Sequence, residues 1–126
     1  MDAEYVFRVR VRIDPAGERV RVDPATFETT LYRRADPPGD EGWLFFRDNL
    51  WRGEVNDEKH HRAMAEEALD VPVDSVAFSA LRTDEAYFDG MKAEIAESLD
   101  LFNADSVSEV ISKYLGSSVE VREGDA

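Results

Sequence analysis

Residues 5–13 alternate strictly along the chain, and no other segment constrains the fold as strongly. A side-chain period of two predicts a β-strand with one buried and one exposed face. One face carries Tyr5, Phe7, Val9, Val11 and Ile13, and the other carries Val6, Arg8, Arg10 and Arg12. We therefore expect a half-buried strand whose apolar side is covered and whose arginine side lies open.

A second strand is predicted over residues 27–33, where alternation returns, and we expect it to pair antiparallel with the first. Between the two strands, Asp14 to Gly17 form a turn signal. Val20 and Val22 suggest a short edge strand that ends at Asp23-Pro24.

A break at residues 36–39, Asp-Pro-Pro-Gly, precedes an aromatic segment that is open to two interpretations. Asp40 is a good helix N-cap and Gly53 a good residue just past a helix end, which together favour a helix. The alternative is a hairpin that turns at Asp48-Asn49, because a short aromatic run does not distinguish helix from strand.

The rest of the chain predicts helices separated by single strands. Asn56 is expected to cap a helix that ends at Val71-Pro72, residues 75–81 to form an interior strand, and Thr83 to Glu85 to begin a long helix with the stripe Phe88, Met91, Ile95, Leu99 and Phe102. Ser106-x-x-Glu109 is a capping box that opens another helix, and Val119 and Val121 mark a last strand. This order predicts an α+β two-layer sandwich, with helices on one face of a mixed or antiparallel sheet.

The 126 residues suggest one domain, residues 1–126, and their charge is unevenly distributed. The formal net charge is -13, with 12 Arg, 3 Lys and no Cys. Residues 1–34 carry a net +1, so the acid excess lies in the remainder. High salt screens such repulsion, so this composition favours the cytoplasm of an extreme halophile, with an ordinary acidic protein of a mesophile as the alternative. The chain lacks an apolar run of bilayer length and a signal-peptide core, so we expect a cytoplasmic protein without a membrane partner.

Catalytic and metal motifs are weak in this sequence. Glu58-x-x-His61 has the spacing of two ligands on one helix face, but His60 and His61 are the only histidines, and neighbouring positions diverge by about 100°. The chain contains no G-x-S-x-G, phosphate-binding glycine loop or cysteine nucleophile. We therefore expect neither a metal nor a cofactor, and we favour a non-enzymatic role over a hydrolase or metal enzyme.

Arg8, Arg10 and Arg12, with Tyr32 on the neighbouring strand, form the more distinctive candidate binding surface. They could form a solvated ion-pair face with Glu28, a homodimer interface, or a site for an anion or single-stranded nucleic acid. The net charge counts against general nucleic-acid binding but is compatible with a local basic stripe.

A second candidate surface is the segment around both tryptophans, with Trp43, Arg47, Trp51 and Arg52 as its contact residues. Tryptophan and arginine are enriched at interface hot spots. Two tryptophans at helical spacing also suit the core of a small domain, and this interpretation is favoured.

Leu50-Trp51-Arg52-Gly53, preceded by residues 42–49 and followed by residues 54–57, resembles the LWR-salt proteins of haloarchaea. The resemblance extends over residues 5–122 and includes residues 27–32, 81–87 and 112–118. It implies a small cytosolic protein of a halophile and supplies no catalytic residues. Our expectation is an interaction or binding module that self-associates, with an anion or single-stranded nucleic-acid binder as the alternative.

Overall fold

The computed structural model describes residues 1–14, 17 and 19–122. Along the chain its elements are β1 (Ala3–Arg12), β2 (Thr26–Arg34), α1 (Phe45–Asn49), β3 (Leu50–Trp51), β4 (Glu54–Val55), α2 (Glu58–Leu69), β5 (Val73–Asp84), α3 (Glu85–Glu97), the 3-10 helix η1 (Leu99–Phe102), α4 (Val107–Leu115) and β6 (Val119–Arg122). The long strands and helices correspond to the alternating and helical segments expected from the sequence.

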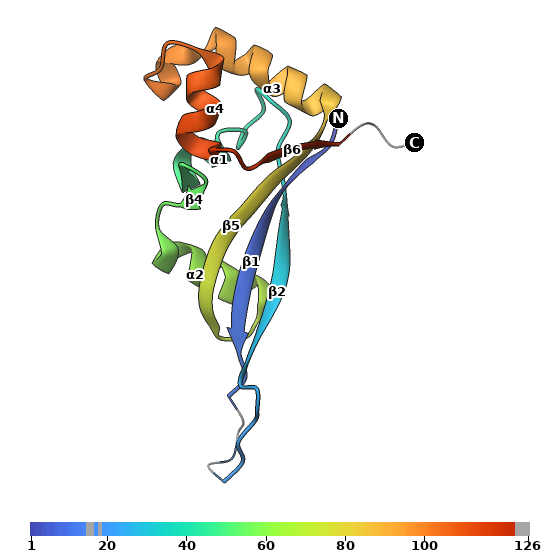
Figure 1. Cartoon of the computed structure of the whole chain (residues 1–126), viewed down its shortest axis with the longest axis vertical. Coiled ribbons are helices and arrows are strands. Elements are labelled where there is room, and N and C mark those ends of the chain that lie inside the picture. Colours follow the sequence, from blue (N-terminus) through green and yellow to red (C-terminus); the bar gives the residue numbers. More distant parts are fainter. Residues whose placement is uncertain (15–16, 18, 123–126) are drawn as a thin grey trace.

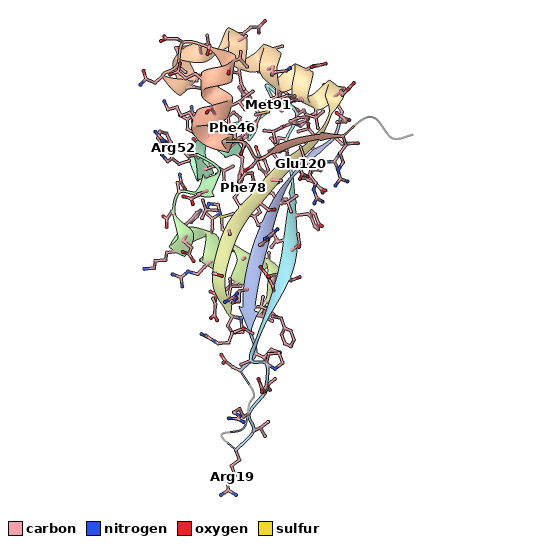
Figure 2. All side chains as sticks on the ribbon, viewed as in Figure 1. Arg19, Phe46, Arg52, Phe78, Met91 and Glu120 are labelled. Carbon is pink, nitrogen blue, oxygen red and sulfur yellow. The ribbon has the colours of Figure 1, made fainter. Side chains whose placement is uncertain are left out.

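The main sheet has four strands in the order β2-β1-β5-β6. β1 pairs antiparallel with both β2 and β5, whereas β6 lies parallel to β5, so the sheet is mixed. The predicted antiparallel pairing of the first two strands is confirmed. Figure 1 shows that the connection between β1 and β2 extends beyond the sheet as an arm, and Arg19 lies at its tip in Figure 2.

The helices cover one face of this sheet, as expected for an α+β two-layer sandwich. Figure 1 shows α2 across the sheet near the arm, while α3 and α4 lie at the opposite end. Tyr5, Phe7 and Val9 of β1 are at most 3% exposed because they face these helices. The inward-facing residues of β5, α3 and α4 belong to the same apolar cluster. The opposite face of the sheet, which we call the open face, carries the arginines of β1.

Side-chain caps begin the three longer helices. Asp57, not the expected Asn56, caps α2, and its carboxylate accepts from the His60 N–H at 3.1 Å. Asp84 caps α3, and Ser106 caps α4 by accepting from the Glu109 N–H at 3.1 Å. The Glu109 carboxylate in turn accepts from the Asp105 N–H at 2.8 Å. The predicted capping box therefore forms, except that the Glu109 carboxylate binds the N–H of Asp105 instead of the N–H of the N-cap residue Ser106.

The aromatic segment forms neither the long helix nor the hairpin at Asp48-Asn49 that the sequence suggested. The helix α1 spans only five residues, and it is followed at once by the β3–β4 hairpin. This hairpin turns at Arg52-Gly53 rather than at Asp48-Asn49. Both turn residues have positive φ, 52° and 82°, as in the type I′ turns that fit the twist of two short strands. Gly53 is thus a turn residue and not the end of a helix.

Two other expectations are wrong. Residues 20–22 form no strand, since Val20 is 59% exposed on the arm, where the described residues provide no third strand for it to pair with. The expected long helix ends at Glu97, because Ser98 leaves helical geometry at φ -134°. The interruption redirects the chain so that Phe102 is fully buried, with its ring stacked on Phe46 at 5.6 Å.

Candidate binding surfaces on the open face and at the Trp51 hairpin

The open face is formed by alternate residues of the four strands, and the register shows which ones lie side by side. On β1 these are Glu4, Val6, Arg8, Arg10 and Arg12; on β2 they are Arg34, Tyr32, Thr30, Glu28 and Thr26, in the same order across the pair. Of the predicted binding residues, Arg8, Arg10, Arg12 and Tyr32 therefore share one face. Arg34 belongs with them, although the sequence interpretation omitted it.

The three predicted arginines of β1 differ in their partners. Arg12 forms ion pairs with Asp74 at 3.1 Å and with Asp14 at 3.4 Å. Arg10 lies opposite Glu28 in the register, yet neither Arg10 nor Arg8 forms an ion pair with any residue that the structure describes. The expected solvated ion-pair face thus exists at Arg12, whereas Arg8 and Arg10 retain unpaired positive charge.

Arg82 of β5 is a further open-face cation that the sequence interpretation missed. Its guanidinium binds the Glu120 carboxylate of β6 at 3.0 Å and lies 6.0 Å from the centre of the Tyr32 ring. The bond to Glu120 is the main reason that the Arg82 pKa is raised. Arg82 lies on the same face as Val6 and Ala80, which are only 2% and 4% exposed although no helix covers them. Arg82 and Tyr32 together shield this end of the open face.

β2 is an edge strand, and its backbone pattern can be read from two hydrogen bonds. Ala35 donates to the Ala3 carbonyl at 2.9 Å, and Ile13 donates to the Ala25 carbonyl at 2.8 Å. In an antiparallel ladder the backbone N–H and C=O groups of successive residues point to opposite sides of the strand. The odd residues of β2 therefore bond to β1, and the even residues direct their N–H and C=O groups outward. The edge is nine residues long, and its Phe27 and Tyr32 side chains are 46% and 53% exposed.

The β3–β4 hairpin separates the residues of the tripeptide 50–52 into different environments. Leu50 is 1% exposed and belongs to the core, whereas Trp51 is 44% exposed. Two cations lie near the Trp51 ring, Arg52 at 5.7 Å and Lys113 at 5.9 Å from its centre. Trp51 and Arg52 therefore lie at the protein surface, so the favoured core interpretation is wrong for Trp51.

Backbone hydrogen bonds attach the turn of this hairpin to the end of α4. Arg52 donates to the Lys113 carbonyl at 2.8 Å, and Gly53 donates to the Tyr114 carbonyl at 3.0 Å. The last carbonyls of a helix have no partner within the helix, so the turn serves as a cap supplied by another part of the chain. Figure 2 shows Arg52 beside the lower end of α4.

Trp43 and Arg47 lie apart from both surfaces. Trp43 is half-buried and contacts the rings of Phe46 and Phe102 at 6.1 and 6.0 Å, so it packs against the core as favoured for it. Arg47 forms an ion pair with Asp48 at 2.8 Å. The eight predicted binding residues are therefore divided among the open face, the hairpin and the core margin.

The two histidines of α2 lie in different environments. His61 is 3% exposed and faces the core, whereas His60 is exposed. Within residues 1–14, 17 and 19–122 there is no group of three or more His, Asp or Glu side chains placed to hold a metal ion. None of the helices described there is long and apolar enough to cross a membrane.

These features define a small α+β protein with helices on one face of a mixed sheet and an uncovered, arginine-bearing face opposite. The chain belongs to the LWR-salt protein family, whose family model matches residues 1–125. Comparisons with curated proteins and with solved structures found no match.

Proposed function

We propose that this protein is a non-enzymatic interaction module of a salt-rich cytoplasm, and that it self-associates through the edge of β2. The observation that carries the proposal is the long exposed edge, with its outward N–H and C=O groups and its exposed Phe27 and Tyr32. An unpaired edge of this kind is a template for another strand. A second copy brings the same edge, because a two-fold axis joins identical surfaces.

Charge selects the register of such a dimer. In an antiparallel pairing centred on Leu31, Glu28 lies opposite the partner subunit's Arg34, and Thr30 lies opposite the partner subunit's Tyr32. Glu28 and Arg34 form no ion pair within the described chain, so both are available. The even residues carry the outward backbone groups, and this register places them opposite even residues, as a hydrogen-bonded ladder requires. Each dimer gains two Glu28–Arg34 pairs and a Leu31–Leu31 contact on the axis.

Light scattering in molar KCl tests this proposal. We expect a dimer for the wild type, and a dimer at least about tenfold weaker for Thr30→Pro, because each subunit loses an outward donor and gains a steric block. Proline at this position leaves the β1–β2 ladder intact, since the Thr30 N–H does not face β1. Thr30→Val keeps the donor and is the matched control. A strictly monomeric wild type at high concentration would contradict self-association.

A charge exchange tests the register. Glu28→Arg places like charges opposite each other across the axis, as does Arg34→Glu, and each single variant should weaken the dimer. The double variant restores opposite charges and should recover dimerisation. Monomeric behaviour of all three variants, with circular dichroism spectra unchanged, would eliminate this register.

A second candidate function rests on Arg8 and Arg10, which form no ion pair with the described residues and lie on the uncovered face with Tyr32. Two arginines beside an exposed aromatic ring could bind an anion or a single-stranded nucleic acid. The Arg8→Ser/Arg10→Ser variant should lose retention of a single-stranded oligonucleotide in high salt. Arg12→Ser is the matched control, because Arg12 is already paired with Asp74. Equal retention of the wild type and the double variant would exclude this function.

A further inference from the structure

A cavity lies on the covered side of the sheet, between β2 and α2. Its volume is about 220 Å³, and its apolar walls include Phe7, Leu31, Phe45 and Met64. α2 packs on β5 but leaves the inner side of β2 uncovered, which accounts for the space beside Leu31. A cavity of roughly 150 Å³ holds a benzene ring in other proteins, so this one has room for a substituted aromatic ring.

The cavity wall contains a buried polar atom without a partner. His61 lines the cavity, is 3% exposed, and its Nε2 has no hydrogen-bond partner. We assign the proton of the neutral imidazole to Nδ1, which leaves a lone pair on the unpartnered Nε2. Burial lowers the His61 pKa, so the ring is neutral at neutral pH. A buried acceptor that lacks a donor costs free energy, and a ligand hydroxyl would supply the donor.

Arg33 supplies a positive charge on the same cavity. Its guanidinium lies 4.4 Å from the centre of the Phe45 ring, and its side chain is exposed. Arg33 forms no ion pair with the residues that the structure describes. Arginine binds a carboxylate through two parallel hydrogen bonds, which makes an organic acid the suitable anion.

We propose that this cavity binds a small hydroxylated aromatic carboxylate. Its ring would pack against Phe7 and Phe45, its hydroxyl would donate to His61 Nε2, and its carboxylate would meet Arg33. Phe7 already packs with Phe45 and His61, at 6.5 and 5.9 Å between ring centres, so the aromatic wall is in place. This inference does not depend on self-association, because the cavity is formed within one chain.

The test uses 3-hydroxybenzoate and 4-hydroxybenzoate as probes, with benzoate and phenol as controls that each lack one polar group. Binding is measured by calorimetry and by the ¹⁵N signals of the His61 imidazole in molar KCl. We expect at least one hydroxybenzoate to shift the His61 signals saturably, and to bind about tenfold or more tightly than benzoate and phenol. No saturable binding of either hydroxybenzoate, or equal binding of benzoate, would overturn the proposal.

Variants locate the two contacts. His61→Phe retains a ring without the acceptor, and Arg33→Gln removes the charge; each should weaken binding of the hydroxybenzoate about tenfold or more. His60→Phe and Arg21→Gln are matched controls, because these side chains do not line the cavity. Unchanged affinity in both test variants would overturn the assignment of the site. Thr30→Pro, which should weaken the dimer, should bind the probe as the wild type does. Failure of ligand binding can therefore be distinguished from failure of self-association.

Discussion

The backbone N–H of Arg52 donates to the carbonyl of Lys113 at 2.8 Å, across 61 residues of sequence. This bond joins the turn of the β3–β4 hairpin to the last turn of α4. Gly53 and Gly116 make the approach possible: a Cβ on Gly53 would lie 3.2 Å from the Leu115 carbonyl oxygen, and one on Gly116 would lie 3.2 Å from that of Arg52. The Leu-Trp-Arg-Gly segment thus joins the hairpin to the helix, while it exposes Trp51 on the surface.

The first prediction concerns Gly53→Ala. Gly53 has a φ of 82°, which costs an L-residue about 1–2 kcal/mol, and the new methyl group would crowd the Leu115 carbonyl. We expect the free energy of unfolding to fall by at least about that amount in urea titrations at fixed KCl. Gly17→Ala is the control, since its φ lies outside the left-handed region and, among the described residues, its Cβ would meet only Val20 Cγ2 at 3.6 Å. Equal stability of the two variants would contradict the tight contact with α4.

The second prediction concerns acid pH and His61. Its pKa is lowered in the folded state, chiefly by burial and then by His60, so the unfolded chain takes up a proton more readily. The corresponding stability is present above about pH 6.5, the ordinary histidine pKa, and is lost as the pH falls below it. His61→Phe should flatten this part of the stability profile, whereas His60→Phe should leave most of it, because burial is the larger cause of the lowered His61 pKa. Parallel profiles for the wild type and His61→Phe would show that burial does not affect the titration of His61.

The sequence predicted the elements whose signals are local. Alternation placed β1 and β2, and capping residues placed the starts of α3 and α4. It could not predict the position of Arg82, because the register of β5 against β1 shifts between Val6 and Phe7. That bulge inserts one extra residue into β5, so odd-numbered residues face the open side before it and even-numbered residues face that side after it. Ala77 and Arg82 therefore both lie on the open face.

The candidate site was predictable only in part, for a similar reason. The arginines of β1 share a face by period alone, so Arg8, Arg10 and Arg12 could be grouped from the sequence. The cavity lined by His61 and Arg33 lies between α2 and β2, which are far apart in the sequence. No local sequence pattern predicts that these two segments lie side by side. The turn at Arg52-Gly53 places a non-glycine residue at positive φ, which hydrogen bonds to α4 support and the sequence does not reveal.

The third prediction concerns alkaline pH and Tyr87. Its hydroxyl donates to the Asp36 carbonyl at 2.7 Å, and burial raises its pKa to about 12. The unfolded chain loses this proton near pH 10, so the corresponding stability is complete below pH 10 and declines as the pH rises toward 12. Tyr87→Phe should lower the free energy of unfolding by about 1 kcal/mol at neutral pH, because the partly buried Asp36 carbonyl loses its donor.

Denaturant unfolding from pH 8 to pH 12 measures this effect. The difference in stability between the wild type and Tyr87→Phe should shrink as the pH rises above 10. Tyr32→Phe is the control, because the Tyr32 side chain is exposed on the open face. A difference that stays constant up to pH 12 would show that the Tyr87 hydroxyl ionises equally in the folded and unfolded chains.

The fourth prediction follows from the net charge of -13. Repulsion among the carboxylates opposes the compact state, and the Debye length shortens from about 10 Å at 0.1 M salt to about 3 Å at 1 M. The unfolding midpoint should therefore rise steeply between low and molar KCl. Replacing the exposed Glu67 and Glu97 by Gln removes two of the charges and should reduce this dependence, whereas the charge-neutral substitution Ser108→Ala on exposed α4 should leave it unchanged. An unfolding midpoint that does not respond to KCl would contradict the proposed salt-rich setting, because the acid excess would then impose no electrostatic cost for salt to relieve.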